Sequence, residues 1–204
     1  MERITGLGFM ILSLLQEGDM HPYEMMRLMR RRHDDRLVPI ANGTFYHTVS
    51  RLERLGLLVE IGVDRAGNRP ERTTYAITES GRTTVADWVR RELPRVDNPA
   101  EFRVALAEAH HLDRREVVDL LKARRAALDA AHRLHHDARR NALDTAVPEQ
   151  FLLEVEREDV LLEAELPWLD RTIARLEQHA FPWGVDELDG PSDRYLNERE
   201  EARR

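Results

Sequence analysis

Apolar positions in the first part of the chain follow a helical period that is interrupted at glycine and proline. Residues 4–16 are apolar on most sides, which predicts a buried helix, and Gly18 follows where a left-handed residue often ends one. Pro22 suits the first turn of a second helix, because its missing N–H would have no helical partner there. The side chains of this second helix that are expected in the core are Tyr23, Met26 and Met29.

A third helical pattern occupies residues 42–55. Asn42 is a suitable N-cap, and a glycine follows the last apolar residue as a stop signal. Phe45, Val49 and Leu52 recur at i, i+4 and i+7, which predicts one buried stripe. The opposite face has no hydrophobic side chain and carries small, hydrogen-bonding and basic groups, with a tyrosine on its flank. The candidate contact residues of this helix are Asn42, Gly43, Thr44, Tyr46, His47, Ser50, Arg51 and Arg54.

The period changes from helical to extended after this third helix. Residues 57–63 and 73–77 alternate as two paired strands do. The loop between them, 64–72, is rich in turn residues and contains three arginines. Thr78 is a suitable cap for a further helix over residues 79–93. The candidate contact residues of the loop are Arg65, Asn68, Arg69 and Arg72.

Three helices followed by a two-stranded ribbon with a basic tip are the elements of a winged helix-turn-helix, in that order. A helix of this kind fits the major groove of DNA, where arginine can bind guanine through two hydrogen bonds. The basic ribbon can reach the neighbouring phosphates or the minor groove. The N-terminal part of the chain is therefore predicted to bind double-stranded DNA.

Long helices dominate the second half of the chain. Asp113 can cap a helix that runs to about Leu143, and Pro148 opens another whose apolar residues recur at three- and four-residue steps. Such apolar seams need partner helices, so we expect them to form a homodimer. Two-fold symmetry would set two recognition helices about 34 Å apart, which implies a palindromic operator. Pro167 lies inside the last pattern and predicts a bend or break near residues 163–166.

Charge divides the chain at Pro94. Residues 1–94 contain 14 arginines and 13 acidic residues, whereas residues 95–204 contain 17 basic and 25 acidic residues. The formal net charge of −7 therefore belongs to the second half. The sequence predicts a mainly α protein with a DNA-binding domain over 1–94, a helical dimerisation or effector domain over 95–183, and a polar, loosely ordered tail over 184–204.

Several classes of function are disfavoured by what the sequence lacks. It has no cysteine, which excludes disulfides, thiolate metal sites and cysteine nucleophiles. It has no phosphate-binding loop, dinucleotide motif or serine elbow, so we expect neither an enzyme nor a cofactor. No apolar stretch approaches the roughly 18 residues of a membrane span, and the N-terminus lacks the features of a signal peptide, so a cytoplasmic protein is expected.

Histidines offer a weaker alternative. His132 and His136 lie one helical turn apart and could bind a cation, which would make the protein a metal-responsive sensor. Solvated or partly packed histidines are the simpler interpretation, because the pair lacks the glutamate of an HExxH motif and His135 falls on the apolar seam. His110 and His111 are adjacent and are expected to point in different directions on a helix, so no metal site is predicted.

Two further interpretations stay open. Trp88 and Trp168 could line a pocket for a small-molecule effector between the DNA-binding and helical regions, although ordinary packing is the favoured interpretation of both side chains. The N-terminal module could also be a platform for protein contacts, in which case the chain would be a helical protein–protein adaptor that does not bind DNA.

Four segments resemble the PadR family of bacterial transcriptional regulators in their order and spacing. They are LGFMILSLLQEGDMHPYEMMRLM, NGTFYHTVSRLERLGLL, RTTYAITESGR and FLLEVEREDVLLEAELPWLDRTIARLE. The resemblance implies a dimeric DNA-binding regulator, usually a repressor, sometimes released by a small molecule. It also implies that residues 42–55 form the recognition helix and residues 65–72 the wing tip.

Two positions depart from the pattern of that family. The chain has Pro22 where members commonly have glycine, which is harmless at the start of a helix. It has His47 where members commonly have proline, which puts a titratable group on the proposed DNA-binding face. The resemblance to the family therefore does not imply how this chain recognises bases at His47.

Overall fold

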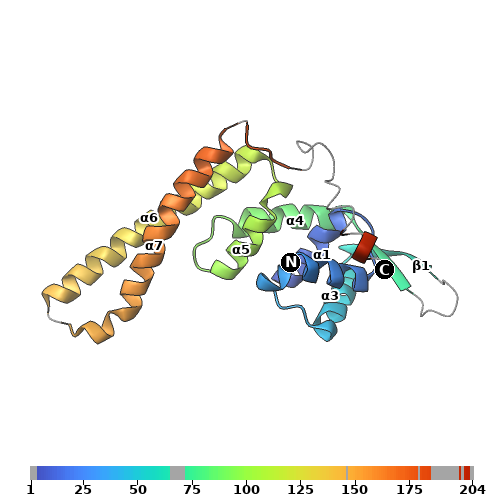
Figure 1. Cartoon of the computed structure of the whole chain (residues 1–204), viewed down its shortest axis with the longest axis horizontal. Helices are drawn as coiled ribbons and strands as arrows, with labels where there is room; N and C mark the ends of the chain where they lie inside the picture. Colours follow the sequence, from blue (N-terminus) through green and yellow to red (C-terminus); the bar gives the residue numbers. More distant parts are fainter. Residues whose placement is uncertain are drawn as a thin grey trace.

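The chain forms a helical module from which two long helices project as an arm (Figure 1). The structure, a computed structural model, describes residues 4–64, 72–145, 147–178, 180–184, 198 and 200–202. Its elements are, in order, α1 (Gly6–Gln16), α2 (Pro22–Arg31), η1 (Asp34–Arg36), α3 (Asn42–Arg54), β1 (Leu58–Asp64), β2 (Arg72–Ile77), α4 (Glu79–Glu92), α5 (Pro99–Ala107), η2 (Ala109–His111), α6 (Arg114–Asp144), η3 (Glu149–Phe151) and α7 (Leu153–Leu176). The described residues are mainly helical with one two-stranded sheet, which confirms the predicted fold class.

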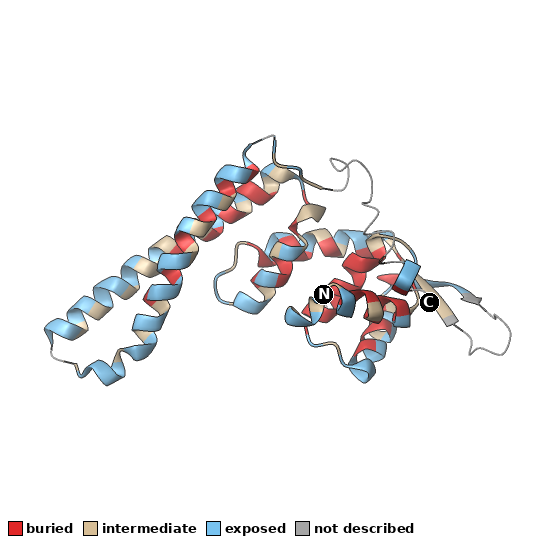
Figure 2. Ribbon diagram, in the orientation of Figure 1, coloured by how far each residue is buried: buried red, intermediate tan, exposed pale blue. Residues whose placement is uncertain are grey.

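The module is built around α1, a helix that is buried along almost its whole length. Thr5 caps the helix, because its hydroxyl accepts a hydrogen bond from the Gly8 N–H at 3.2 Å. Every residue from Gly6 to Leu15 is buried, which confirms the predicted all-round apolar helix. Both α3 and α4 pack against α1, and Figure 2 shows the buried residues of the module gathered around it.

The second helix begins at Pro22 as predicted, but one of its side chains is exposed. His21 caps α2, since its Nδ1 accepts a hydrogen bond from the Tyr23 N–H at 3.0 Å. Met26 and Met29 are buried as expected. The prediction that Tyr23 is buried is wrong: its side chain is 47% exposed, because it lies on the outer side of α2 beneath the guanidinium of Arg27.

The predicted strands form an antiparallel hairpin. The pairing of β1 with β2 starts with Leu58 opposite Ile77 and has one irregularity in register. Met20, in the turn between α1 and α2, exchanges two backbone hydrogen bonds of 3.1 Å with Tyr75 in β2. This bridge holds the hairpin against the helical core.

A glycine allows α4 to approach the start of β1. Thr78 caps α4 as predicted, because its hydroxyl accepts a hydrogen bond from the Gly81 N–H at 3.1 Å. A Cβ atom at Gly81 would overlap the carbonyl oxygen of Leu57 and would lie 2.7 Å from Cγ1 of Ile77. No larger residue fits at position 81 unless the helix and the strand separate.

The two long helices α6 and α7 pack side by side along the arm (Figures 1 and 2). Asp113 caps α6 as predicted, since its carboxylate accepts a hydrogen bond from the Arg115 N–H at 2.8 Å. None of the described helices is both long and apolar enough to cross a membrane. The buried residues of the seam are Val117, Leu121 and Leu128 of α6 and Leu162, Leu166, Leu169, Ile173 and Leu176 of α7. Ala138 and Phe151, which the apolar repeats after Asp113 and Pro148 also predict for the seams, are exposed.

The helix α7 continues through Pro167, so the chain does not break near residues 163–166, and the predicted bend there stays a prediction. Proline lacks the N–H that would bond one turn earlier in the helix, and its ring crowds the carbonyl group there. Pro167 is exposed, whereas Leu166 and Leu169 on either side of it are buried in the seam. The packing of these neighbours against α6 holds the helix together across the missing hydrogen bond.

Arg124 joins the arm to the module. The residue is 2% exposed, its guanidinium lies 3.5 Å from the centre of the Phe102 ring in α5, and it donates to the carbonyl oxygen of Arg95. Its Nε also donates to the carboxylate of Glu165 in α7 at 2.9 Å. The hydrophobic core continues through this junction, and the domain boundaries drawn from the sequence stay predictions.

The end of the chain returns to the module. The carboxylates of Glu198 and Glu201 pair with Arg32 and Arg31 at the end of α2, and Ala202 is buried. Acidic side chains of these residues thus meet a basic helix end from the start of the chain, and the loosely ordered tail over 184–204 stays a prediction. The segment that connects them to the arm lies outside the described residues.

Asp34, at the start of η1, is partly buried near the junction. Burial, together with the negative charge of Glu108, raises the pKa of the Asp34 carboxyl to about 6, although Arg32 and Arg36 oppose the shift. The ionised form of Asp34 is therefore less stable in the folded protein than in the unfolded chain.

Replacing Gly81 with alanine is expected to destabilise the fold by about 1–3 kcal/mol, because α4 and β1 must move apart to admit the methyl group. Gly43→Ala is the matched control, since a Cβ atom there meets nothing within 4 Å, and alanine is the better helix former. Urea unfolding followed by circular dichroism measures both variants. Equal midpoints would contradict the close approach at Gly81.

Asp34→Asn is expected to raise the melting temperature at about pH 7.5 and to leave it unchanged at about pH 4. A raised pKa in the folded state means that the wild type is most stable when Asp34 is protonated. It loses stability as the pH rises from the unfolded-state pKa of about 4 through the folded-state value. Thermal unfolding across this range measures the difference, with the exposed neighbour Asp35→Asn as control. A gain of equal size at both pH values would show that Asp34 is not the responsible group.

Candidate nucleic-acid interface

The helix α3 has one buried face and one exposed face, as its sequence predicts. Phe45, Val49 and Leu52 are buried in the module. Among the candidate contact residues of α3, Arg51 is half-buried and the others are exposed. The exposed residues are Asn42, Gly43, Thr44, Tyr46, His47, Ser50 and Arg54. These residues together with Arg51 are called the α3 surface below.

Asn42 does not cap α3. The helix begins at Asn42 and its N-cap position is Ala41, whose side chain makes no capping hydrogen bond. The Asn42 Oδ1 instead accepts a hydrogen bond from Nη2 of Arg30 in α2 at 2.8 Å. The predicted N-cap is therefore wrong by one residue, because a tertiary contact engages the asparagine side chain.

The first turn of α3 is open to an anion. It contains no acidic residue, and a Cβ atom at Gly43 would meet only open space. The first N–H groups of a helix have no partner within the helix and carry a partial positive charge. A phosphate oxygen could therefore take the place of the missing side-chain cap.

The helix α2 adds basic side chains beside α3 that the sequence reasoning did not include. Arg30 is exposed next to Asn42, and Arg27 lies over the exposed ring of Tyr23. In a helix-turn-helix, the helix before the recognition helix crosses the DNA backbone, so these side chains are placed to meet phosphates. Their spacing of three residues, which puts them on one side of α2, could have revealed them.

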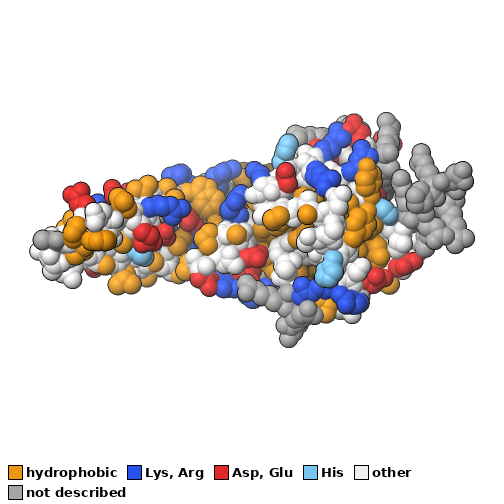
Figure 3. Space-filling view, turned by 90° about the horizontal axis from the view of Figure 1, so that it is seen from below, with side chains coloured by type: hydrophobic (Ala, Val, Ile, Leu, Met, Phe, Trp, Pro, Cys, Tyr) orange, Lys and Arg blue, Asp and Glu red, His pale blue; other side chains and the backbone are white. Residues whose placement is uncertain are grey.

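The second half of α3 is basic. The Arg54 Nε donates to the carbonyl oxygen of Ser50 at 3.4 Å, and both Arg51 and Arg54 lie in the last turn, where the helix dipole favours cations. Glu53 is the one acidic residue of α3, and it is half-buried. Figure 3 shows arginine and histidine side chains close together along the lower margin of the module.

The hairpin carries the predicted wing, of which the structure describes the base. Asp64 at the end of β1 lies opposite Arg72 at the start of β2. Arg65, Asn68 and Arg69 lie outside the described residues, and Arg72 is described only by its place in the strand. Their contact with DNA stays a prediction.

The two candidate pocket tryptophans lie in different surroundings. Trp88 is buried in the module and stacks on Phe9, with ring centroids 4.0 Å apart and an interplanar angle of 20°. Trp168 is half-buried on α7 and packs against the hydrophobic core. Trp88 is thus a core side chain in this structure, and the effector pocket stays a prediction.

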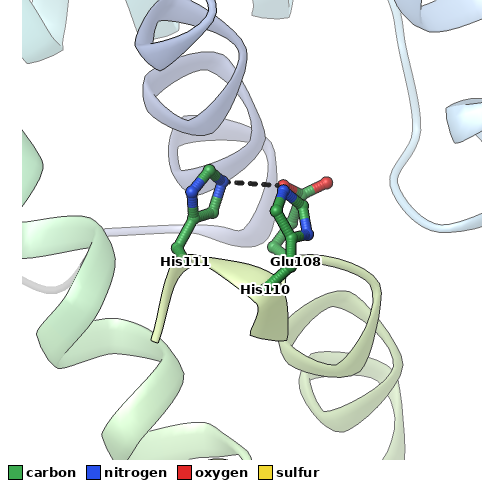
Figure 4. A group of neighbouring side chains, drawn as sticks. All are labelled: Glu108, His110 and His111. Carbon is green, nitrogen blue, oxygen red and sulfur yellow. Dashed lines mark hydrogen bonds and ion pairs between the residues drawn. The ribbon is translucent and has the colours of Figure 1, made fainter. Parts of the chain in front are cut away.

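A second polar cluster lies where the module meets the arm (Figure 4). The His111 Nε2 lies 2.7 Å from the Ser13 Oγ and 3.2 Å from the Glu108 Oε2, and the Ser13 hydroxyl donates to the same carboxylate. The ring centroids of His110 and His111 are 4.3 Å apart. The expectation that these two histidines point in different directions is wrong, because they belong to the short turn η2 and not to a continuous helix.

Burial and hydrogen bonding set the charges of this cluster. Burial acts to raise the pKa of Glu108, but hydrogen bonds from His111 and Ser13 outweigh it and hold that pKa below its usual value. Burial lowers the pKa of His110, and the neighbouring His111 adds to this shift while Glu108 opposes it. At neutral pH the cluster therefore contains an ionised Glu108 and a neutral His110.

The histidines of α6 form no comparable group. In the part of the chain that the structure describes, the cluster at η2 is the only set of three or more histidine or acidic side chains whose ligand atoms converge. His132 and His135 are half-buried and His136 is exposed. The pair His132 and His136, which the sequence offered only as an alternative cation site, thus lacks a third ligand among the described residues.

The arrangement of these elements defines the class of the protein. The helices α2 and α3 are connected through η1, α3 exposes a polar and basic face, and the β1–β2 hairpin follows it. This is a winged helix-turn-helix, a class of DNA-binding module.

Residues 11–87 match the family described as the Transcriptional regulator PadR-like family. The winged-helix module of this chain is therefore similar to a family of transcriptional regulators. Among proteins with curated descriptions, none matches the chain.

Solved structures also resemble the chain, at low identity. Bacillus subtilis PadR in complex with operator DNA is 18% identical with a TM-score of 0.42, and the match covers 86% of this chain and 99% of that chain. The protein smu.1604c from Streptococcus mutans UA159 is 18% identical with a TM-score of 0.39, over 82% and 98% of the two chains. Bacillus subtilis PadR in complex with p-coumaric acid is 17% identical with a TM-score of 0.38, over 85% and 100%. Identities this low do not transfer residue roles from one protein to another.

Proposed function

We propose that the protein is a repressor that binds a palindromic operator as a homodimer and blocks transcription by occluding the promoter. The observation that carries this proposal is the α3 surface. Phe45, Val49 and Leu52 hold the helix in the core, so that it turns small, polar and basic side chains outward. A helix of this composition suits the major groove of double-stranded DNA.

The groups of the α3 surface have chemistry that suits distinct contacts. Arg51 and Arg54 can each bind N7 and O6 of guanine, and the Ser50 hydroxyl can bond to a base edge. Tyr46 can donate to a phosphate oxygen, which positions the protein without reading the sequence. Gly43 leaves space for the DNA backbone to approach the start of the helix.

The second copy of the chain is proposed to pack on the outer face of the arm. At about 100° per residue, α7 carries a second apolar stripe opposite the one that packs on α6. Leu153 and Val160 in this stripe are 65% and 58% exposed, and Pro167 continues it. Figure 3 shows apolar side chains exposed along the arm.

Burial of these side chains favours a partner. Removing a large aliphatic side chain from water is worth about 1.5–3 kcal/mol. A second copy is the simplest partner, because the same stripe on two chains can meet itself across a two-fold axis. Such a dimer would set two α3 helices about one turn of DNA apart, which suits a palindromic operator.

Release by a small molecule or a partner protein is proposed to act through the angle between arm and module. Arg124 holds this angle through contacts with two parts of the module, the Arg95 carbonyl and the Phe102 ring. A ligand that favours a different angle would change the separation of the two α3 helices, and a few ångströms would be enough to lose one half-site. Trp168 lies in the arm near this junction and stays the candidate wall for such a ligand.

Fluorescence anisotropy with a duplex from upstream of the protein's own gene tests DNA binding. The wild type should bind more weakly as salt rises, because phosphate contacts release counterions. Arg54→Ala should lower the affinity about tenfold or more and reduce the preference for the operator over a scrambled duplex. Arg69→Ala should weaken both duplexes alike and reduce the salt slope by about one.

Arg115→Ala is the matched control, because it removes an exposed arginine at the start of α6. Its affinity should equal that of the wild type. Equal affinity of Arg54→Ala and the wild type would overturn the assignment of the α3 surface. If the wild type bound none of the upstream duplexes at low salt, DNA binding itself would be rejected in favour of a protein–protein adaptor.

A double variant, Leu153→Glu with Val160→Glu, tests the dimer. It should sediment as a monomer at concentrations where the wild type is a dimer, because carboxylates from both chains would be buried without partners. Its helicity should be retained, since neither position lies in the seam with α6. Arg115→Glu introduces the same side chain elsewhere on the arm and should stay dimeric. A monomeric wild type, or a double variant that stays dimeric, would contradict this interface.

A further inference from the structure

The cluster of Glu108, His110 and His111 has no part in the proposed DNA contact, and it has the composition of a metal site. Each residue offers one ligand atom, and these atoms lie within 4.8 Å of one another. Tetrahedral ligands about 2.1 Å from a zinc ion lie about 3.4 Å apart, so side-chain rotations suffice to close the set. Figure 4 shows the three side chains rising from the same turn toward one another.

The backbone arranges these ligands locally. The helix α5 ends at Ala107 and the following turn is closed by a hydrogen bond of 3.2 Å from the His111 N–H to the Glu108 carbonyl oxygen. The Trp183 Nε1 donates to the carbonyl oxygen of Leu112 at 2.9 Å and so packs the C-terminal end of the arm against this turn. The three ligands are therefore placed together before any ion binds.

The groups that surround the ligand side chains also suit a metal site. The backbone of Ala107 acts to raise the pKa of His110, and a backbone group close to an imidazole can orient the ring for coordination. The ionised Glu108 and neutral His110 are in the protonation states that metal ligands need. The charge of Glu108 also disfavours the ionised form of Asp34, and a cation at the cluster would relieve this repulsion.

We propose that Glu108, His110 and His111 bind one divalent transition-metal ion, for which Zn²⁺ is the best fit. Two imidazoles and a carboxylate suit zinc and similar ions, whereas Mg²⁺ and Ca²⁺ prefer ligand sets made of oxygen. Three protein ligands leave a fourth position for water, which is the pattern of an accessible site. All three residues are half-buried, so an ion can reach them.

Ser13 connects this site to the centre of the module. Its hydroxyl contacts both Glu108 and His111, and it comes from the buried helix α1. An ion that coordinates Glu108 and His111 would compete with these contacts. Metal binding would thus change how η2, at the base of the arm, is held against α1.

Titration of the untagged full chain, stripped with a chelator, tests the site. Calorimetry with zinc sulfate alone should show one ion per chain. Zinc should also raise the melting temperature, since an ion that binds only the folded state stabilises it. Substitution with Co²⁺ should give the visible absorption of a tetrahedral site with nitrogen and oxygen ligands.

His110→Ala is the sharpest variant, because it leaves the hydrogen bonds among Ser13, Glu108 and His111 in place. It should lower the affinity for zinc at least about tenfold and remove the Co²⁺ absorption, while its circular dichroism spectrum stays that of the wild type. Glu108→Gln should also weaken zinc binding, and it checks the oxygen ligand.

The double variant His132→Ala with His136→Ala is the matched control and should bind zinc as the wild type does. A wild type that binds no zinc would overturn the proposal, and so would a folded His110→Ala that binds it with unchanged affinity. Loss of binding in the control variant alone would place the ion on α6 and would also overturn it. The outcome is independent of DNA binding, because the titration contains no DNA and uses only the metal.

Discussion

The relation between arm and module depends on the buried guanidinium of Arg124. Moving a cation out of water costs several kcal/mol unless its donors are satisfied, and here the Arg95 carbonyl, the Glu165 carboxylate and the Phe102 ring surround it. Because the Arg95 carbonyl and the Phe102 ring belong to the module, a shift of the arm would leave a buried donor of Arg124 unpaired. The junction therefore favours one arrangement, which is what a regulator needs if the spacing of two DNA-binding modules is to be defined.

Sequence periodicity is sufficient to predict a helix and its exposed side where the burial of one helix face determines the structure. The stripe of Phe45, Val49 and Leu52 fixes which side of α3 is exposed, and the structure confirms it. The Asp113 cap and the apolar seam after it likewise locate α6 to within one residue at each end. In both elements the local signals and the packing point to the same structure, so no knowledge of distant residues is needed.

Sequence reasoning fails where a distant residue decides the environment. The Asn42 side chain is engaged by Arg30 from another helix, and Glu201 meets Arg31 from the opposite end of the chain. His110 and His111 point together because the chain forms a separate turn between α5 and α6, whereas a helical period assumes a continuous helix. Residue spacing cannot predict these contacts, since each arises only when elements far apart in the sequence pack together.

The turn η2 and Arg124 both affect the angle between the arm and the module, because both lie near the base of α6. With 31 residues, α6 is about 46 Å long, so a rotation of about 5° at its base moves its far end by about 4 Å. If two chains pair through their arms, a change of angle at each junction moves each α3 helix relative to the dyad, and symmetry doubles the change in their separation. A ligand therefore does not need to touch α3 to affect DNA binding. It needs to act near the base of α6, where Arg124 and the contacts of Ser13 with Glu108 and His111 hold the arm in place.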